Sequence, residues 1–416
     1  MKRISSEQSH LINILKSSLH ANALVYDAKS IDLSRLHWEK ILMMAKNHAV
    51  LSLLYDTLNR DNNFPRDMFN EVQKISRQVV LQNYRLLYLT NYIVKLLEYQ
   101  QIKVIVLKGA ATANLYPVPE LRKAGDIDLL VARKEDFQRA CDTLQQQGFE
   151  IQEEQTVNHH LVFKTKDGVE IELHTMLAEP FDSPRVNKYL SNLALEYYDH
   201  SMIENVLGSY LPVPEDAYHA FHLLLHMLQH YLGSGFGLKL LCDWVVFWNR
   251  DVLEKDVDKF HSIVNSCGLN GFMERVTATC VYYLGLEEHR VRFLDMATQN
   301  KEGIENFMME TLESEEFGKS SADRMLVLRG TSPFHYVREF HHQMCLNYLT
   351  ASKFFILWPV LWIMTLLRFL NNNRKIRKTS LWAILHMTNI RSKNKENLHL
   401  FQANQNIKRR GKLLDK

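Results

Sequence analysis

Two aspartates one residue apart form the first pattern in this sequence that can do chemistry. Asp126 and Asp128 open the run Asp126 to Val131, whose aliphatic residues predict a strand. Because side chains alternate between the faces of a strand, both carboxylates point one way, while Ile127 and Leu129 point into a core. Neighbouring carboxylates repel each other unless a cation lies between them. The spacing therefore predicts a metal site.

A third carboxylate follows further along the chain. Residues His160 to Phe163 and Val169 to His174 flank an Asp-Gly turn, which predicts a β-hairpin. Glu170, Glu172 and His174 share one face of its second strand. An acid on a neighbouring strand completes a three-acid site. Such a site can hold two Mg²⁺ ions roughly 3.5–4 Å apart for phosphoryl or nucleotidyl transfer.

The elements that must position these acids can be read from the surrounding residues. Val104 to Val106 predicts a first strand, Ala110 to Ala113 can begin a helix, and Pro119 marks a turn before the second strand. Lys134 to Gln147 is helical, with Gly148 as its C-terminal stop. This order of strand, helix, strand, helix and hairpin predicts a small mixed sheet with helices on one side.

A family resemblance rests on these motifs in combination. The chain resembles the uncharacterised bacterial nucleotidyltransferase family, within the DNA polymerase β-type nucleotidyltransferase superfamily. The matching motifs lie between Val104 and His174, and the pattern extends to the helical segment around Asp243. They read Leu107-Lys108-Gly109, Leu115-Tyr116-Pro117, Arg122, Gly125-Asp126-Ile127-Asp128-Leu129-Leu130-Val131 and Ile171-Glu172-Leu173-His174.

The resemblance implies a specific activity. A nucleoside monophosphate would pass from an NTP, with ATP as the expected nucleotide, to a hydroxyl of an unidentified small molecule, saccharide or protein, and pyrophosphate would be released. Asp126 and Asp128 would bridge two Mg²⁺ ions, and Glu172 would hold the second ion and act as general base. The family's acid-Leu-His ending favours Glu172 over Glu170 as the third acid. His174 is a candidate for orienting it.

Three residues are candidates for binding the nucleotide phosphates. Gly109 lets the backbone approach a phosphate at the start of the following helix, and Lys108 and Arg122 are candidate cations for the β- and γ-phosphates. The superfamily usually has Gly-Gly or Gly-Ser after the first strand, whereas here the turn reads Lys108-Gly109-Ala110. The missing hydroxyl makes phosphate binding the weaker part of the resemblance.

The composition of the whole chain is that of an ordinary globular protein. Its 416 residues are 46% hydrophobic and 23% charged, which allows two or three domains. Its five scattered cysteines, with no C-x-x-C pair, predict neither disulfides nor a zinc site and favour the cytoplasm. The predicted fold class is α+β. The expected parts are an N-terminal helical segment 1–101, a catalytic α/β domain 102–200, a helical domain 201–350 and a tail 351–416.

Histidines and one acid stand out in the predicted helical domain. The helix after Pro214 carries His219, His222, His226 and His230 on about one face. They are open to two interpretations, a weak transition-metal site or a lining of the active-site cleft. The pair His159-His160 could bind a metal or a phosphate, and it also fits a surface or strand-packing role. Asp243, embedded in an apolar helix, must be paired or face the cleft.

The tail combines an apolar segment with strong positive charge. Phe354 to Leu367 is nearly all apolar, and Arg374, Lys375, Arg377 and Lys378 follow. Residues from Asn371 onward carry a net +10, against −7 for the preceding 370. Residues 354–378 therefore fit a segment lying on an anionic membrane surface, such as the inner membrane surface. They also fit a core helix with a solvated tail. No nucleic-acid motif supports a nucleic-acid partner.

Two further functional interpretations stay open. The atypical Lys-Gly-Ala turn is compatible with a catalytically inactive module that binds a nucleotide or a partner at a membrane-associated assembly. The second interpretation is a transferase of the toxin–antitoxin type, which modifies a protein or RNA.

Overall fold

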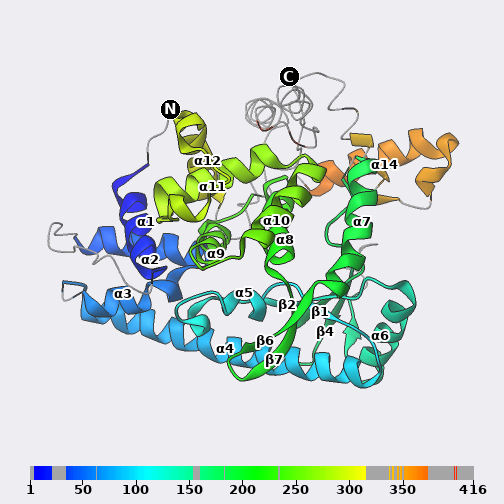
Figure 1. Cartoon of the computed structure of the whole chain (residues 1–416), viewed down its shortest axis with the longest axis horizontal. Coiled ribbons are helices and arrows are strands. Elements are labelled where there is room, and N and C mark those ends of the chain that lie inside the picture. The colour runs from blue at the N-terminus through cyan, green and yellow to red at the C-terminus, as the bar shows by residue number, and fades with distance from the viewer. Residues whose placement is uncertain are drawn as a thin grey trace.

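The computed structural model contains a mixed sheet surrounded by helices, the α+β class expected from the sequence. Figure 1 shows the long helix α4 along one side of the molecule, with the N-terminal helices near one end and the sheet near the other. The later helices stand above both. The structure describes residues 4–20, 34–61, 63–152, 160–181, 183–232, 235–314 and 351–372, isolated positions between 337 and 348, and residues 398 and 400.

Five strands form the main sheet in the order β1-β2-β5-β4-β3. β2 and β5 run parallel, and the other neighbouring pairs are antiparallel. The expected hairpin is confirmed as β4 and β5, and β5 lies directly beside β2. The strands are β1 (Ile105–Val106), β2 (Asp126–Leu130), β3 (Glu150–Ile151), β4 (His160–Lys164) and β5 (Glu170–His174).

Helix α4 (Arg66–Tyr99) connects the N-terminal helices to the sheet. The sequence predicts one long helix here because the span contains no interior Gly or Pro, and the structure confirms it. Near its start, Met68 and Val72 pack into the larger of two hydrophobic cores. Further along, Ile93 and Leu97 pack into a second core beneath the sheet. The helices before it are α1 (Ser6–Ser18), α2 (Arg35–Asn47) and α3 (Tyr55–Arg60).

A second hairpin, β6 (Ser201–Val206) and β7 (Ser209–Pro214), was not predicted. From the sequence, Pro212 and Pro214 indicate a transition zone between elements. Pro is nevertheless tolerated in an edge strand, where its missing N–H costs no ladder bond. The two-residue turn has positive φ at Leu207 and Gly208, as a tight hairpin requires. Val206, Leu211 and Val213 join the core beneath the sheet. The hairpin therefore packs with the sheet, although it lies at the start of the span expected to be helical.

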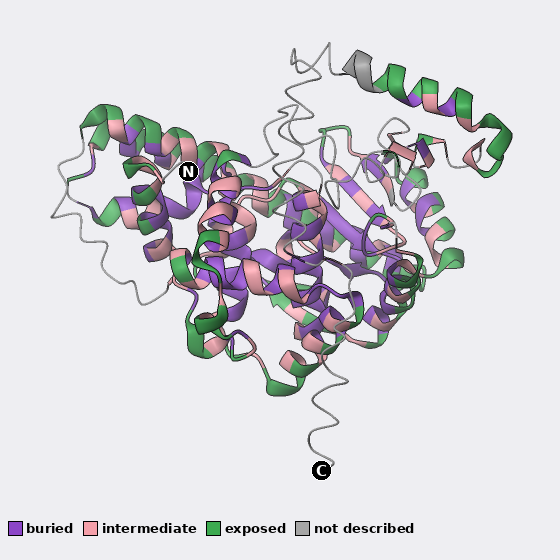
Figure 2. Ribbon diagram, turned by 90° about the horizontal axis from the view of Figure 1, so that it is seen from above, coloured by how far each residue is buried: buried purple, intermediate pink, exposed green. Residues whose placement is uncertain are grey.

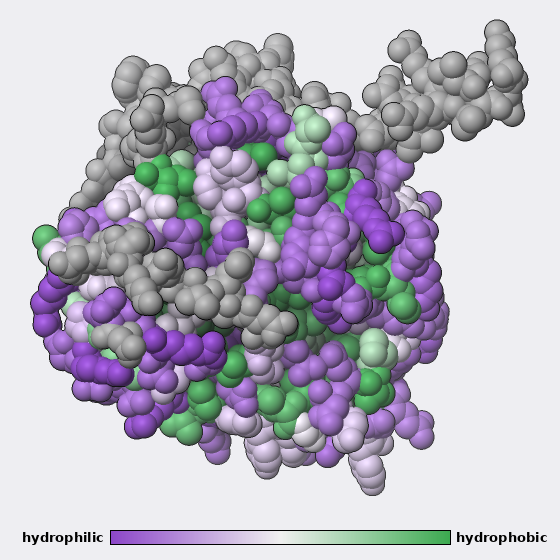
Figure 3. Space-filling model, turned by 60° about the vertical axis from the view of Figure 1, so that its left-hand side comes forward, coloured by the Kyte–Doolittle hydropathy of each residue, from purple (hydrophilic) through white to green (hydrophobic). Residues whose placement is uncertain are grey.

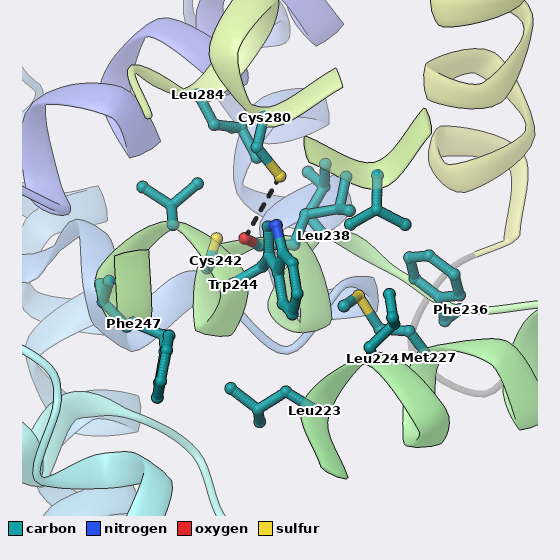
Figure 4. Packing of buried hydrophobic residues seen from close by; sticks show 14 of the residues in the cluster. Leu223, Leu224, Met227, Phe236, Leu238, Cys242, Trp244, Phe247, Cys280 and Leu284 are labelled. Atoms are coloured by element: carbon teal, nitrogen blue, oxygen red, sulfur yellow. Dashed lines mark hydrogen bonds between the residues drawn. The ribbon is translucent and has the colours of Figure 1, made fainter. Parts of the chain in front are cut away.

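The remaining helices build the larger core. The sequence predicts helices at 256–267, 271–284 and 304–312, and the structure confirms them as α10, α11 and α12. Figure 4 shows Trp244 between Cys280 on one side and Leu223 on the other, where neighbouring helices meet. Buried residues concentrate where these helices meet, as Figure 2 shows. The helices are α7 (Pro184–Asp199), α8 (Asp216–Leu232), α9 (Leu238–Trp248), α10 (Glu254–Cys267), α11 (Asn270–Leu284) and α12 (Lys301–Ser314).

The apolar segment of the tail forms the helix α14 (Trp358–Asn372), after a short 3-10 turn at Phe355–Leu357. Within the described part of the chain, no helix combines the length and apolar character needed to cross a membrane. The basic residues 374–378 lie outside the described residues.

Candidate active site

The sheet register places two carboxylates side by side. Asp128 on β2 is the direct partner of Glu172 on the parallel strand β5, and Asp126 is the partner of Glu170. Ile127 and Leu129 are buried beneath the sheet, as the strand alternation predicts, so the acids lie on the opposite face. Asp128 is itself only 1% exposed. An ionised carboxylate that is this deeply buried needs a compensating charge.

His174 joins the two carboxylates. Its Nε2 lies 3.1 Å from Oδ1 of Asp128 and 3.3 Å from Oε2 of Glu172. Burial by itself lowers the pKa of His174, but hydrogen bonds to Asp128 and Glu172 outweigh this effect and raise the pKa to about 9. Without a metal ion, the protonated imidazole therefore supplies part of the compensating charge.

The three residues fit a divalent metal ion. One ligand atom from each of Asp128, Glu172 and His174 lies within 4.8 Å of the others. The second carboxylate oxygen of Asp128, Oδ2, is buried without a hydrogen-bond partner among the described residues. A buried carboxylate oxygen with no donor is costly, and a cation satisfies it. The carboxylate oxygens suit Mg²⁺, whereas a neutral imidazole nitrogen suits a softer metal ion.

Glu170, the alternative third acid, has a different environment. Its Oε1 pairs with Nζ of Lys164 on β4 at 3.2 Å, and both side chains are more than one-third exposed. Glu172 instead faces Asp128 and His174. The geometry therefore favours Glu172 over Glu170.

Lys108 supplies a fixed positive charge at the end of β1. Its Nζ lies 3.1 Å from Asp128 and 3.6 Å from Asp126. Burial opposes the charged form, but Asp128, Asp126 and Glu172 together raise the pKa of Lys108. The ammonium group also lies 3.3 Å from Nε2 of His226. Lys108 is therefore at the carboxylates, as a phosphate-binding role requires.

Gly109 adopts a backbone conformation that other residues rarely reach. Its φ is +68°, and a Cβ built on it would lie 3.4 Å from the carbonyl oxygen of Asp126. The positive φ therefore favours glycine here, whereas the carbonyl oxygen lies at an ordinary van der Waals distance. The helix that follows, α5 (Ala110–Ala113), is a single turn.

Arg122, a candidate for binding the nucleotide phosphates, is already paired with groups of the protein. It is buried, with Nε 2.7 Å and Nη2 2.8 Å from the two carboxylate oxygens of Asp243 on α9. Its Nη1 donates to the carbonyl oxygen of Gly109 at 3.4 Å. The Tyr116 hydroxyl donates to the same carboxylate at 2.6 Å. Arg122 thus ties the Gly109 turn to α9, which explains the buried acid that the sequence left without a partner.

The histidine row on α8 faces the same region. His226 meets Lys108 and lies 3.0 Å from His230, and His219 lies 3.5 Å from the hydroxyl of Thr112. Burial lowers the pKa of His222 and of His226 well below the usual value, and the nearby charge of Lys108 lowers it further. Both histidines are therefore neutral. Of the two interpretations, the contact with Lys108 favours the cleft lining. Among the described residues, the row does not form a metal-binding group.

Two predicted residues cannot be placed in the site. His159 lies outside the described residues, and only the backbone of His160 is described.

These features define an α+β protein whose sheet carries a carboxylate–imidazole group able to bind a metal ion. A family model described as "Uncharacterised nucleotidyltransferase" matches residues 34–285. Because this span exceeds half of the chain, the protein belongs to that nucleotidyltransferase family. The span contains every site residue discussed above, including Asp243.

Other comparisons add little. None of the curated proteins compared matches the chain. A solved structure of an antigenic nucleotidyltransferase-like protein from Paracoccidioides brasiliensis is 16% identical and covers 49% of this chain and 93% of that one, with a TM-score of 0.32. This likeness is too slight to support an argument.

The Arg122–Asp243 pair leads to a prediction about stability. Asp243→Ala leaves the Arg122 guanidinium buried and unpaired, which is expected to lower the free energy of unfolding by about 3–5 kcal/mol. Denaturant unfolding measures the change. Glu170→Gln, which removes the partly exposed pair with Lys164, is the control and should cost at most about 1 kcal/mol. Equal losses in the two variants would contradict the assignment.

The histidine row leads to a prediction about pH. His222 is buried and neutral, and neither ring nitrogen has a hydrogen-bond partner among the described residues. The unfolded chain binds a proton here below about pH 6.5 and the folded chain does not, so stability falls as the pH drops. Between pH 6.5 and pH 5, the free energy of unfolding of His222→Leu should therefore rise by about 2 kcal/mol relative to that of wild type. Denaturant unfolding at the two pH values measures the difference. The exposed His289→Leu is the control. A pH-independent difference for His222→Leu would refute the prediction.

Proposed function

We propose that the protein is a Mg²⁺-dependent nucleotidyltransferase of the DNA polymerase β type. It transfers a nucleoside monophosphate from an NTP, with ATP as the expected nucleotide, to a hydroxyl of a small molecule, saccharide or protein, and releases pyrophosphate. The main support is the pairing of Asp128 with Glu172 on adjacent strands, where Oδ2 of Asp128 is buried without a described donor. Membership of the nucleotidyltransferase family points the same way.

The carboxylates have distinct roles in this proposal. Asp126 and Asp128 would hold two Mg²⁺ ions, with Glu172 as a ligand of the second. When bound, these ions neutralise the triphosphate and align its α-phosphorus. Glu172 accepts the proton of the acceptor hydroxyl as general base. His174 positions the carboxylates of Asp128 and Glu172, since its Nε2 lies within 3.3 Å of both.

Lys108 stabilises the negative charge on the departing pyrophosphate. Its Nζ lies next to Asp126 and Asp128, the residues that would hold a divalent ion. Such an ion would repel the ammonium group, which donates a hydrogen bond to neutral His226 at 3.3 Å. We therefore assign His226 to positioning Lys108 towards the β- and γ-phosphates.

Arg122 is a positioning residue in the proposal. Both sides of its guanidinium are used, one by Asp243 and the other by the carbonyl oxygen of Gly109. It shapes the turn through which the Gly109 backbone approaches the phosphates. The cytoplasm, the proposed location, supplies both NTP and Mg²⁺.

Substitution of the acids tests the proposal. Asp126→Asn, Asp128→Asn and Glu172→Gln are each expected to lower pyrophosphate release from an NTP by at least about 100-fold, because each removes a metal ligand. The assay is a screen of labelled NTPs against sugars, polyols, peptides and cell lysate. The lysate also reports transfer to protein or RNA.

Glu170→Gln is the matched control, since Glu170 lies two residues from Glu172 and pairs with Lys164. Its activity should stay within about twofold of wild type, as expected for a partly exposed ion pair. Calorimetry with Mg²⁺ and NTP distinguishes the alternative function. An NTP that binds and is never consumed with any acceptor indicates the inactive binding module.

Lys108 can be tested by binding. Lys108→Met removes the cation beside the acids, so NTP affinity should fall about tenfold or more, while Mn²⁺ affinity stays equal or rises. Calorimetry measures both affinities. Lys164→Met, which removes the lysine paired with Glu170, should change neither. Unchanged NTP affinity in Lys108→Met would remove Lys108 from the phosphate site.

A further inference from the structure

Helix α14 exposes an apolar stripe along its length. Val360, Ile363 and Leu367 are 57%, 60% and 59% exposed, and Met364 is exposed beside them. The spacing of three, four and seven residues places them on one face. Figure 1 shows α14 at the edge of the molecule. The face over the N-terminal helices in Figure 3 is instead mostly hydrophilic, with apolar side chains in small groups.

The opposite face of α14 holds the helix in place. Leu361 and Thr365 are buried there. The indole N–H of Trp358 donates to the carbonyl oxygen of Ser352, and that of Trp362 donates to Nδ1 of His341. These contacts fix the rotation of the helix about its axis, so the apolar stripe faces outward.

The turn before α14 extends the apolar surface. Phe354, Phe355, Ile356 and Leu357 are all exposed there. Such a concentration of exposed aromatic and aliphatic side chains indicates a binding surface. Lys353 lies before this turn and Arg368 ends the stripe, and both are exposed.

The charge of the segment restricts what can cover it. From Ala351 to Lys395 the chain contains nine Lys or Arg residues and no Asp or Glu. Two copies of this surface facing each other would bring like charges together, which is unfavourable. An anionic lipid surface instead offers hydrocarbon to the stripe and negative headgroups to the flanking cations.

We propose that α14 and the turn at 354–357 form a membrane-binding element that lies in the plane of an anionic lipid bilayer. The apolar stripe enters the boundary between headgroups and acyl chains. Lys353 and Arg368 contact headgroup phosphates. Trp358 and Trp362 face away from the bilayer and keep the helix attached to Ser352 and His341. This binding does not depend on nucleotidyl transfer.

Vesicle flotation with the full-length protein tests the proposal. Wild type should float with vesicles of equal parts phosphatidylglycerol and phosphatidylcholine, and about tenfold less with phosphatidylcholine alone. Salt at about 0.5 M should weaken the binding, because it screens the charges. Val360→Glu/Leu367→Glu should lower partitioning about tenfold or more. Circular dichroism melting checks that the variants fold.

The matched control is Leu81→Glu/Tyr88→Glu, which also replaces two exposed apolar residues seven apart on one helix. It should float as wild type does. Equal flotation of the stripe variant and wild type overturns the proposal, as does equal binding of wild type to neutral vesicles. Another result would also overturn the proposal: wild type does not float, sedimentation shows it to be a dimer, and the stripe substitutions dissociate that dimer. The stripe would then bind a second copy of the chain.

Discussion

The buried ion pair between Arg122 and Asp243 is the constraint on which the site depends. It joins the turn after β1 to helix α9, and so connects the sheet to the helical core. Tyr116 donates to the same carboxylate, and Arg122 reaches the carbonyl oxygen of Gly109. Neither charge is solvated, so each requires the other to be in place. The position of α9 therefore determines the shape of the turn beside the carboxylates.

The site combines carboxylates and cations on one face of the sheet. Asp126, Asp128 and Glu172 contribute negative charge, and Lys108 and the protonated His174 compensate for part of it. The buried Oδ2 of Asp128 stays without a described donor. A further cation would satisfy this oxygen, and the group that Asp128 forms with Glu172 and His174 could hold a metal ion.

Helix α8 places uncharged histidine side chains beside this charged site. Burial and the charge of Lys108 keep His222 and His226 unprotonated, so neither adds positive charge, and His226 accepts a hydrogen bond from Lys108. A row of lysines on this helix would neutralise the carboxylates and oppose metal binding. The helical part of the chain thus contributes to the chemistry of the sheet.

The local parts of this protein can be predicted from short stretches of the chain. Alternation placed Asp126 and Asp128 on one strand face, the Asp-Gly turn predicted the hairpin carrying Glu172, and uninterrupted helical periodicity predicted α4. These signals depend on neighbours within a few residues. Which side chains meet across the chain depends on how the helices and the sheet pack together. The partnership of Arg122 with Asp243, 121 residues away, and of Lys108 with His226, 118 residues away, follows from how the helices pack on the sheet. No local pattern encodes a contact between two such distant residues. The β6–β7 hairpin was missed for the same reason, because its prolines are acceptable only where the surrounding fold makes it an edge.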